Sequence, residues 1–206
     1  MITVPAYFDE IRRKSTQDAG YIAGFEVMDI INEPTAAAIS FGFQRGLLSA
    51  SDQHQKPQTI LVYDLGGGTF DVTVMRISGE HFVALATDGD VQLGGRDWDQ
   101  RLVDLVAEEF IRTHRIDPRE DPNTNGRVWR DCEDAKRTLT ARTKTVISCD
   151  YQGLTIRLEI TRDRFQEITQ DLLDRTAFTT RQTLQASGLQ WSDRKSTRLN
   201  SSHVVI

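Results

Sequence analysis

The 206-residue sequence is poor in the features that mark several common classes of protein. Its two cysteines, Cys132 and Cys149, have no metal-binding or redox spacing, which is typical of reduced thiols in a cytoplasmic protein. No apolar run approaches membrane-spanning length, and the N-terminus lacks the basic and then apolar order of a signal peptide. A net charge of −5 argues against a nucleic-acid-binding surface. We therefore expect a soluble globular protein without membrane or nucleic-acid partners.

The sequence also lacks the two commonest phosphate-binding loops. A Walker A loop reads Gly-x-x-x-x-Gly-Lys-Ser/Thr, and a dinucleotide fingerprint reads Gly-x-Gly-x-x-Gly at the start of a helix. Neither occurs around the glycine run of this chain, where residues 64–71 read Asp-Leu-Gly-Gly-Gly-Thr-Phe-Asp. Apolar and polar residues alternate after the glycines, which predicts a strand there rather than a helix. The segment is therefore predicted to be a strand–turn–strand hairpin with glycines at its tip.

The residue types of this hairpin suit a nucleoside triphosphate. Glycine tolerates positive φ and has no Cβ, so successive backbone N–H groups can converge on an anion. The carboxylates of Asp64 and Asp71 are hard oxygen ligands suited to magnesium or to its waters, and a triphosphate site needs both kinds of contact. The plainer alternative is a glycine-rich turn with solvated aspartates. We predict phosphate contacts from four consecutive residues: Gly66, Gly67, Gly68 and Thr69.

Hydrophobic periodicity predicts an alternation of strands and helices along the rest of the chain. The predicted strands are 2–4, 27–31, 59–64, 69–77, 81–87, 146–149 and 154–160. The three strands from 59 to 87 are predicted to form a meander sheet, and the last two strands a hairpin through Gln152–Gly153. The predicted helices are 9–24 with Asp9 as its N-cap, 34–41, a stretch around 98–110, 124–140, and a final helix capped by Thr161.

Three further runs stand in order around the glycine hairpin. Residues 2–8 read Ile-Thr-Val-Pro-Ala-Tyr-Phe, residues 31–38 read Ile-Asn-Glu-Pro-Thr-Ala-Ala-Ala, and residues 93–99 read Leu-Gly-Gly-Arg-Asp-Trp-Asp. With the hairpin, they closely resemble the nucleotide-binding domain of the DnaK-type, seventy-kilodalton heat-shock chaperones, up to about Trp191. The resemblance implies an α/β fold of the actin-like ATPase (ribonuclease-H-like) type. The alternative is an actin-like filament or cell-shape ATPase that shares the hairpin.

The resemblance implies roles for individual residues in binding ATP or ADP with Mg²⁺. Glu33 matches a catalytic glutamate that helps to arrange magnesium and the attacking water, although a helix cap before Pro34 is the plainer interpretation. Gly94 and Gly95 match a second approach to phosphate; alone, they would indicate a turn. The catalytic group implied is Glu33, Asp64, Thr69 and Asp71, and the metal group, acting through water, is Glu33, Asp64 and Asp71.

Residues 132–140 resemble the helix of this family that holds adenosine. Spacings of three and four residues put four of its polar side chains on adjacent parts of one helical face. The resemblance implies that Glu133 and Lys136 address the ribose and that Arg137 stacks on the purine. Thr140 replaces the usual serine and keeps its hydroxyl. The plainer alternative is a solvated charged helix with an i,i+3 ion pair.

The resemblance also implies coupling and partners. Pro5 and Arg13 match a proline–arginine pair that relays nucleotide state towards a peptide-binding domain. The partners implied are unfolded polypeptide clients, bound through another domain, a J-domain co-chaperone and a nucleotide-exchange factor. The parent protein is expected to be a cytoplasmic chaperone that hydrolyses ATP while it assists protein folding.

We expect three parts in an incomplete ATPase domain. Residues 1–48 match the end of lobe I, and residues 49–193 match most of lobe II, with an upper subdomain at about 95–160. The loop 46–57 is the expected crossing between lobes. Residues 194–206 depart from the family, as translated adapter sequence or a disordered tail would. The family's first phosphate hairpin and a catalytic lysine find no counterpart here, so the chain alone is expected to be inactive.

Overall fold

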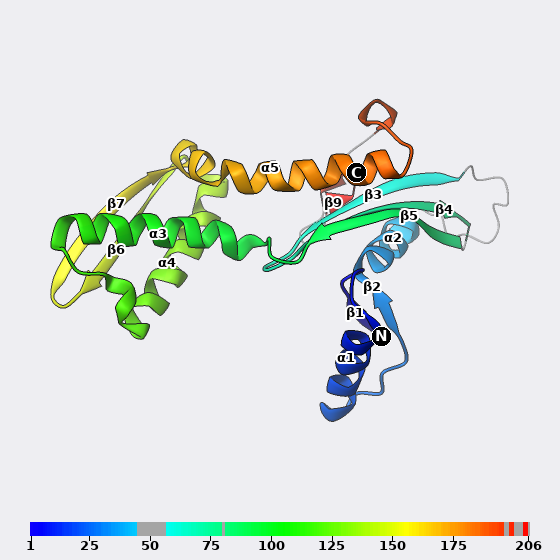
Figure 1. Cartoon of the computed structure of the whole chain (residues 1–206), viewed down its shortest axis with the longest axis horizontal. Helices are drawn as coiled ribbons and strands as arrows, with labels where there is room; N and C mark the ends of the chain where they lie inside the picture. The colour runs from blue at the N-terminus through cyan, green and yellow to red at the C-terminus, as the bar shows by residue number, and fades with distance from the viewer. Residues whose placement is uncertain (45–56, 80, 196–197, 200–203, 206) are drawn as a thin grey trace. The chain divides into compact units, whose positions relative to one another are not determined.

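The computed structural model describes residues 1–44, 57–79, 81–195, 198–199 and 204–205 (Figure 1). The expected lobe crossing at 46–57 lies outside them except for Pro57. The chain divides into two compact units, Met1–Gln92 with Thr176–Ile206, and Leu93–Arg175. We call them unit 1 and unit 2. The predicted limits of the two lobes, of the upper subdomain and of the tail remain predictions.

Unit 1 begins with a small α/β element that ends at Glu33, which is predicted to be catalytic. Strand β1 (Ile2–Val4) pairs in parallel with β2 (Ile30–Asn32), and α1 (Glu10–Ile22) connects them. Asp9 caps α1, as predicted, because its Oδ1 accepts the Arg12 backbone N–H at 2.9 Å. Helix α2 (Glu33–Gln44) starts directly after β2. The short β2 strand therefore fixes where Glu33 stands.

The larger sheet of unit 1 carries the glycine hairpin. Strands β3 (Gln58–Leu65), β4 (Phe70–Ser78) and β5 (His81–Asp90) form the predicted antiparallel meander, with β4 in the centre. Helix α2 packs on this sheet through the fully buried Ala38, which belongs to a core cluster with Ile60 and Met75 (Figure 1). Two short tail strands, β8 (Arg198–Leu199) and β9 (Val204–Val205), extend the sheet beyond β3.

Unit 2 packs two helices against a β-hairpin. Helices α3 (Gly95–His114) and α4 (Pro122–Ala141) cover β6 (Lys144–Tyr151) and β7 (Leu154–Thr161). The predicted Gln152–Gly153 turn is confirmed, and both residues have positive φ (51° and 74°), as a tight two-residue hairpin requires. The core contains Leu102, Val103, Val106, Phe110, Val128, Cys132, Leu139, Ile147 and Ile160, all nearly inaccessible to solvent.

The remaining elements complete the chain. Thr161 caps α5 (Arg162–Ala186), as predicted, by accepting the Arg164 backbone N–H at 3.1 Å. Helix α5 contributes residues to both units. Two short 3₁₀ helices, η1 (Pro118–Glu120) and η2 (Trp191–Asp193), lie after α3 and α5.

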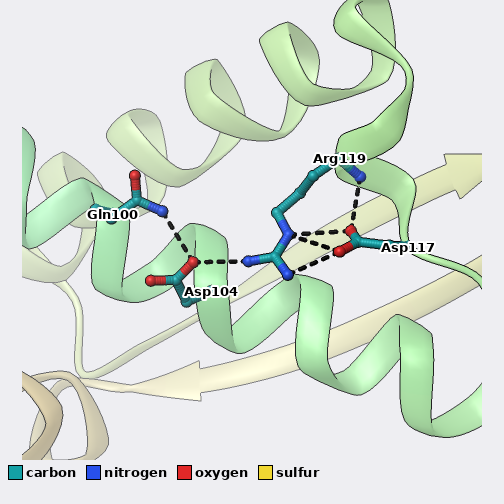
Figure 2. Close-up of polar contacts among 4 residues, drawn as sticks. All are labelled: Gln100, Asp104, Asp117 and Arg119. Atoms are coloured by element: carbon teal, nitrogen blue, oxygen red, sulfur yellow. Dashed lines mark hydrogen bonds and ion pairs between the residues drawn. The ribbon is translucent and has the colours of Figure 1, made fainter.

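A polar network fixes the connection between α3 and α4 (Figure 2). The Arg119 guanidinium donates to both oxygens of Asp117, at 2.8–3.1 Å, and to Asp104 Oδ1 on α3, at 2.9 Å. Gln100 Nε2 donates to the same Asp104 oxygen at 2.9 Å. The side-chain hydrogen bond from Arg119 lowers the pKa of the Asp117 carboxyl. The network therefore holds η1 against α3.

Neighbouring residues of β6 provide a test of this core. Ile147 is 1% exposed and Val146, on the opposite face of the strand, is 47% exposed. We expect Ile147→Ala to lower the free energy of unfolding of unit 2 by about 2–5 kcal/mol, because it leaves a cavity. Val146→Ala should change it by about 0.5 kcal/mol or less. Urea denaturation followed by circular dichroism measures both, and equal effects would contradict this core.

Candidate functional site

The glycine tip is an open turn between β3 and β4. The Gly66 N–H donates to the Thr69 carbonyl oxygen at 2.9 Å, which closes the turn. Gly67 and Gly68 are exposed, and a Cβ added to either would meet nothing within 4 Å. None of the three glycines has positive φ, so the left-handed conformation that glycine tolerates is not used here. What the glycines provide is open space beside the backbone, through which a ligand can approach it.

The two aspartates of the hairpin are direct cross-strand partners. Asp64 pairs with Asp71 in the register of β3 and β4, so both side chains lie on the same face of the sheet. Their residues are 8% and 4% exposed. Burial, and after it the negative charges of Glu33 and Asp64, together raise the pKa of the Asp71 carboxyl to about 6. The structure therefore brings Glu33, Asp64 and Asp71 into one electrostatic cluster.

One carboxylate oxygen of this cluster accepts no hydrogen bond from the described residues. Asp71 Oδ1 is buried and has no hydrogen-bond partner among the described residues. A buried acceptor without a donor is costly unless a ligand, water or cation supplies the interaction. No group of three His, Cys, Asp or Glu residues in the described part of the chain is placed to hold a metal ion. Magnesium contacts through water from Glu33, Asp64 and Asp71 remain a prediction.

Tyr7 is a site residue that the sequence analysis did not select. Its hydroxyl makes a side-chain hydrogen bond with Thr69. Burial raises the pKa of the Tyr7 hydroxyl, and the negative charge of Asp71 adds to that shift. The residue lies in the family-like run 2–8, which was the only signal for it. Tyr7 thus links the end of β1 to the hydroxyl predicted to contact phosphate.

The predicted coupling pair lies in a chain of contacts next to Glu33. The Phe8 N–H donates to the Pro5 carbonyl oxygen at 3.1 Å, and Arg13 Nε donates to the Phe8 carbonyl oxygen at 3.0 Å. Arg13 Nη2 also donates to Asn32 Oδ1. Asn32 directly precedes Glu33 in the chain. Pro5 and Arg13 are therefore connected, and their contacts reach the residue before the predicted catalytic glutamate.

Gly89 on β5 is required by the close approach of this strand to the site. It stands opposite Asp71 in the register of β4 and β5. A Cβ at Gly89 would lie 2.5 Å from the Phe70 carbonyl oxygen and 3.2 Å from Asp71 Oδ1. The sequence analysis missed it because the strand was predicted to end at residue 87, whereas β5 runs to Asp90.

The residues predicted to hold adenosine have separate partners in unit 2. Lys136 Nζ donates to Asp99 Oδ2 and to the Gly95 carbonyl oxygen, each at 2.8 Å. Arg137 Nη2 instead pairs with Glu133 Oε1 at 2.5 Å, four residues away, and both side chains reach solvent. The alternative of an i,i+3 pair between Glu133 and Lys136 is therefore wrong. Thr140 is exposed on the same helix.

The turn before α3 is already held by its own residues. The Gly94 N–H donates to Asp97 Oδ2 at 2.7 Å, and the Asp97 N–H donates to the Gly94 carbonyl oxygen at 2.8 Å. The side chain of Asp97 therefore occupies the Gly94 N–H, which is a group that a phosphate would need. Phosphate contacts from Gly94 and Gly95 remain predictions.

Comparison with known proteins identifies the family. The sequence model of the Hsp70 protein family matches residues 1–199, so the chain belongs to the Hsp70 family. It is 42% identical over 199 residues to the chaperone protein DnaK of two strains of Halobacterium salinarum, with 94% of this chain and 30% of those proteins covered. It is 41% identical to the DnaK of Thermosipho africanus, with 94% and 32% covered.

These comparisons confirm the predicted DnaK-type family and, with it, the actin-like ATPase fold. None of them favours the actin-like filament alternative. The chain spans about a third of the length of these curated relatives. In the described part of the chain, no helix has the length and apolar composition needed to cross a membrane.

The titration of Asp71 predicts a pH dependence of stability. Its pKa is about 6 in the folded protein against an ordinary 3.8, so the folded state binds more protons between these values. Stability should therefore fall as pH rises from about 4 to 7, by roughly 2 kcal/mol at this residue. Asp71→Asn should lose this contribution, whereas Asp88→Asn, at an exposed position of β5, should keep it. Urea unfolding between pH 4 and pH 7 tests this, and an Asp71 midpoint near 3.8 by carboxyl NMR would contradict it.

A pair of glycine substitutions tests the contact of β5 with the site. Gly89→Ala forces its Cβ against the Phe70 carbonyl oxygen and should destabilise unit 1 by about 1–3 kcal/mol. Gly126→Ala makes the same chemical change in α4, where a Cβ meets nothing within 4 Å. It should stabilise unit 2 by about 0.5–1 kcal/mol. Thermal unfolding of both variants should give midpoint shifts of opposite sign. An unchanged midpoint for Gly89→Ala would show that β5 can accommodate the additional Cβ.

Proposed function

We propose that this chain is part of the ATP-binding and ATP-hydrolysing domain of a DnaK-type molecular chaperone. The observation that carries the proposal is the cross-strand pair of Asp64 and Asp71, with the Glu33 charge acting on Asp71. Thr69 and the open glycine tip lie at the end of the same two strands. Phosphoryl transfer depends mainly on positioning and electrostatics, and this hairpin supplies backbone, hydroxyl and carboxylate groups for both.

The proposed nucleotide contacts are described separately for each unit. In unit 1, Gly66, Gly67, Gly68 and Thr69 bind phosphate oxygens. In unit 2, Gly94 and Gly95 make a further phosphate contact, and Glu133, Lys136, Arg137 and Thr140 hold adenosine. The planar Arg137 guanidinium suits stacking on a purine, and it is exposed.

The carboxylates prepare water for attack on the γ-phosphate. Magnesium, held through water by Glu33, Asp64 and Asp71, neutralises phosphate charge when bound. Glu33 and Asp71 orient a water in line with the bond between the γ-phosphorus and the ADP oxygen, so that the new P–O bond forms as that bond breaks. A carboxyl with a pKa near 6, such as Asp71, can accept a proton from that water near neutral pH.

The activity and partners of the whole protein are further parts of this proposal. Pro5 and Arg13 relay nucleotide state to a peptide-binding domain that holds unfolded polypeptide clients. A J-domain co-chaperone and a nucleotide-exchange factor act on the ATPase domain in the cytoplasm. The contacts of Arg13 with Phe8 and Asn32 support a relay, because they connect Arg13 to the residue before Glu33.

Calorimetric titration of the purified chain with ADP tests the proposed site. We expect ADP with Mg²⁺ to bind more tightly than ADP with a chelator. Asp71→Asn should reduce the magnesium-dependent increase in ADP affinity about tenfold, as expected when a contact to a charged group is lost. Asp88→Asn removes the same charge one residue from Gly89, on the opposite face of β5, and should leave the gain unchanged. Affinity that is independent of magnesium in the unsubstituted chain would overturn the proposed metal site.

A further inference from the structure

Asp99 is a buried acidic residue of unit 2 to which none of the predicted nucleotide contacts gives a role. It lies in the second turn of α3 and is 6% exposed. Its Oδ2 accepts a hydrogen bond from Lys136 Nζ at 2.8 Å. Its Oδ1 is buried and has no hydrogen-bond partner in the described part of the chain. The Lys136 ammonium is therefore the cation that balances the Asp99 charge.

Two of the three N–H donors of the Lys136 ammonium are used by acceptors at the start of α3. An ammonium group has three N–H donors. One goes to Asp99 and a second to the carbonyl oxygen of Gly95, so both acceptors belong to the beginning of α3, whereas Lys136 lies on α4. The Lys136 side chain keeps 25% of its surface accessible, against 9% for Asp99. One donor thus remains for a ligand, and its direction is set by the other two.

Burial of this pair is difficult to explain by stability alone. A buried ion pair often contributes no more to folding than apolar residues of the same volume, and an unpartnered carboxylate oxygen lowers its contribution further. The ion pair of Lys144 and Glu159 in the same unit is, by contrast, an ordinary surface pair, with side chains 64% and 53% accessible to solvent. The geometry of Asp99 fixes one ammonium at the junction of two helices, which suits orientation of a ligand contact.

We propose that Asp99 is a positioning residue for nucleotide recognition. It holds the Lys136 ammonium against the Gly94–Gly95 turn, so that the remaining donor of Lys136 points to a ribose hydroxyl. Asp99 itself is buried and touches no nucleotide. One ion pair then sets both the ribose contact and the turn predicted to approach phosphate. This inference rests on the proposed function, because it concerns the orientation of a residue in the adenosine-binding face.

The test compares ADP with 2′,3′-dideoxy-ADP, which lacks both ribose hydroxyls. Binding of each to the full chain is measured by ligand-detected NMR titration up to millimolar concentrations. The unsubstituted chain should prefer ADP by about tenfold, as expected for a hydrogen bond from a charged donor. Asp99→Asn should reduce this preference to about twofold or less, and should leave binding of the dideoxy nucleotide nearly unchanged. Lys136→Met should do the same.

Three further variants make the comparison specific. The double variant Asp99→Asn, Lys136→Met should lose no more preference than Lys136→Met alone, because Asp99 acts through Lys136. Lys144→Met removes an ammonium of the same length from an exposed pair of unit 2 and should keep the full preference. Asp99→Glu keeps the charge but displaces the carboxylate by one methylene, and it should also lose the preference. It provides the measurement if the Asp99→Asn chain does not fold.

Each outcome decides between named alternatives. If Asp99→Asn and Asp99→Glu keep the tenfold preference, Asp99 does not position Lys136, and the proposed function stands without it. An equal loss of affinity for both nucleotides, with a lower thermal midpoint, would assign Asp99 a purely structural role and also overturn the inference. If the unsubstituted chain binds no ADP at millimolar concentration, the proposed function itself fails and this inference fails with it.

Discussion

The close approach of buried carboxylates at the β3–β4 hairpin is the physical constraint that defines the candidate site in unit 1. Asp64 and Asp71 face each other across two strands, and burial together with neighbouring carboxylates holds the pKa of Asp71 at about 6. Ionised carboxylates at such close quarters repel one another, so they stay together only because the sheet leaves them no other position. β4 lies between β3 and β5, and Gly89 lets β5 approach so closely that Asp71 is enclosed. The pairing of β4 with both neighbouring strands keeps these carboxylates in place.

Unit 2 handles a buried carboxylate in another way. The charge of Asp99 is balanced within the protein by Lys136, and the same ammonium fixes the turn before α3 through Gly95. The two units therefore differ in how they treat buried charge. Each keeps one buried carboxylate oxygen without a partner among the described residues, Asp71 Oδ1 and Asp99 Oδ1, and unit 2 in addition uses the ion pair of Asp99 to set the geometry of a helix junction. Both arrangements cost folding free energy and gain a defined orientation.

Features that depend on local pattern were predictable from the sequence. Alternation after the glycines predicted β4, the caps at Asp9 and Thr161 are confirmed, and the turn at Gln152–Gly153 has the expected conformation. These features depend on residues that are close in the chain, whose preferences are set by backbone sterics and local hydrogen bonds. Short motif runs likewise sufficed to indicate the family, because several of them occur in a fixed order.

Contacts between residues far apart in the chain were not predictable in the same way. Lys136 was assigned to a helical face with Glu133, yet its partner is Asp99, 37 residues earlier. Periodicity states which residues share a face but not which neighbouring helix supplies an acceptor. Tyr7 was missed for the same reason, since it matters through one contact with the β3–β4 hairpin.

The end of α4 has a consequence for the order in which unit 2 forms. Its last carbonyl groups lie near a residue from beyond the β6–β7 hairpin: Arg162 donates to the carbonyl oxygens of Leu139, Thr140 and Arg142, at 2.8, 3.3 and 2.9 Å. Helix carbonyls of this kind lack partners inside the helix. On the ribosome, α4 therefore emerges with an incomplete C-terminus, which is completed only when the hairpin has closed and returned Arg162. Lysine at 162 would keep the charge but not the fork that reaches several carbonyls at once, so the helix end would fray during synthesis.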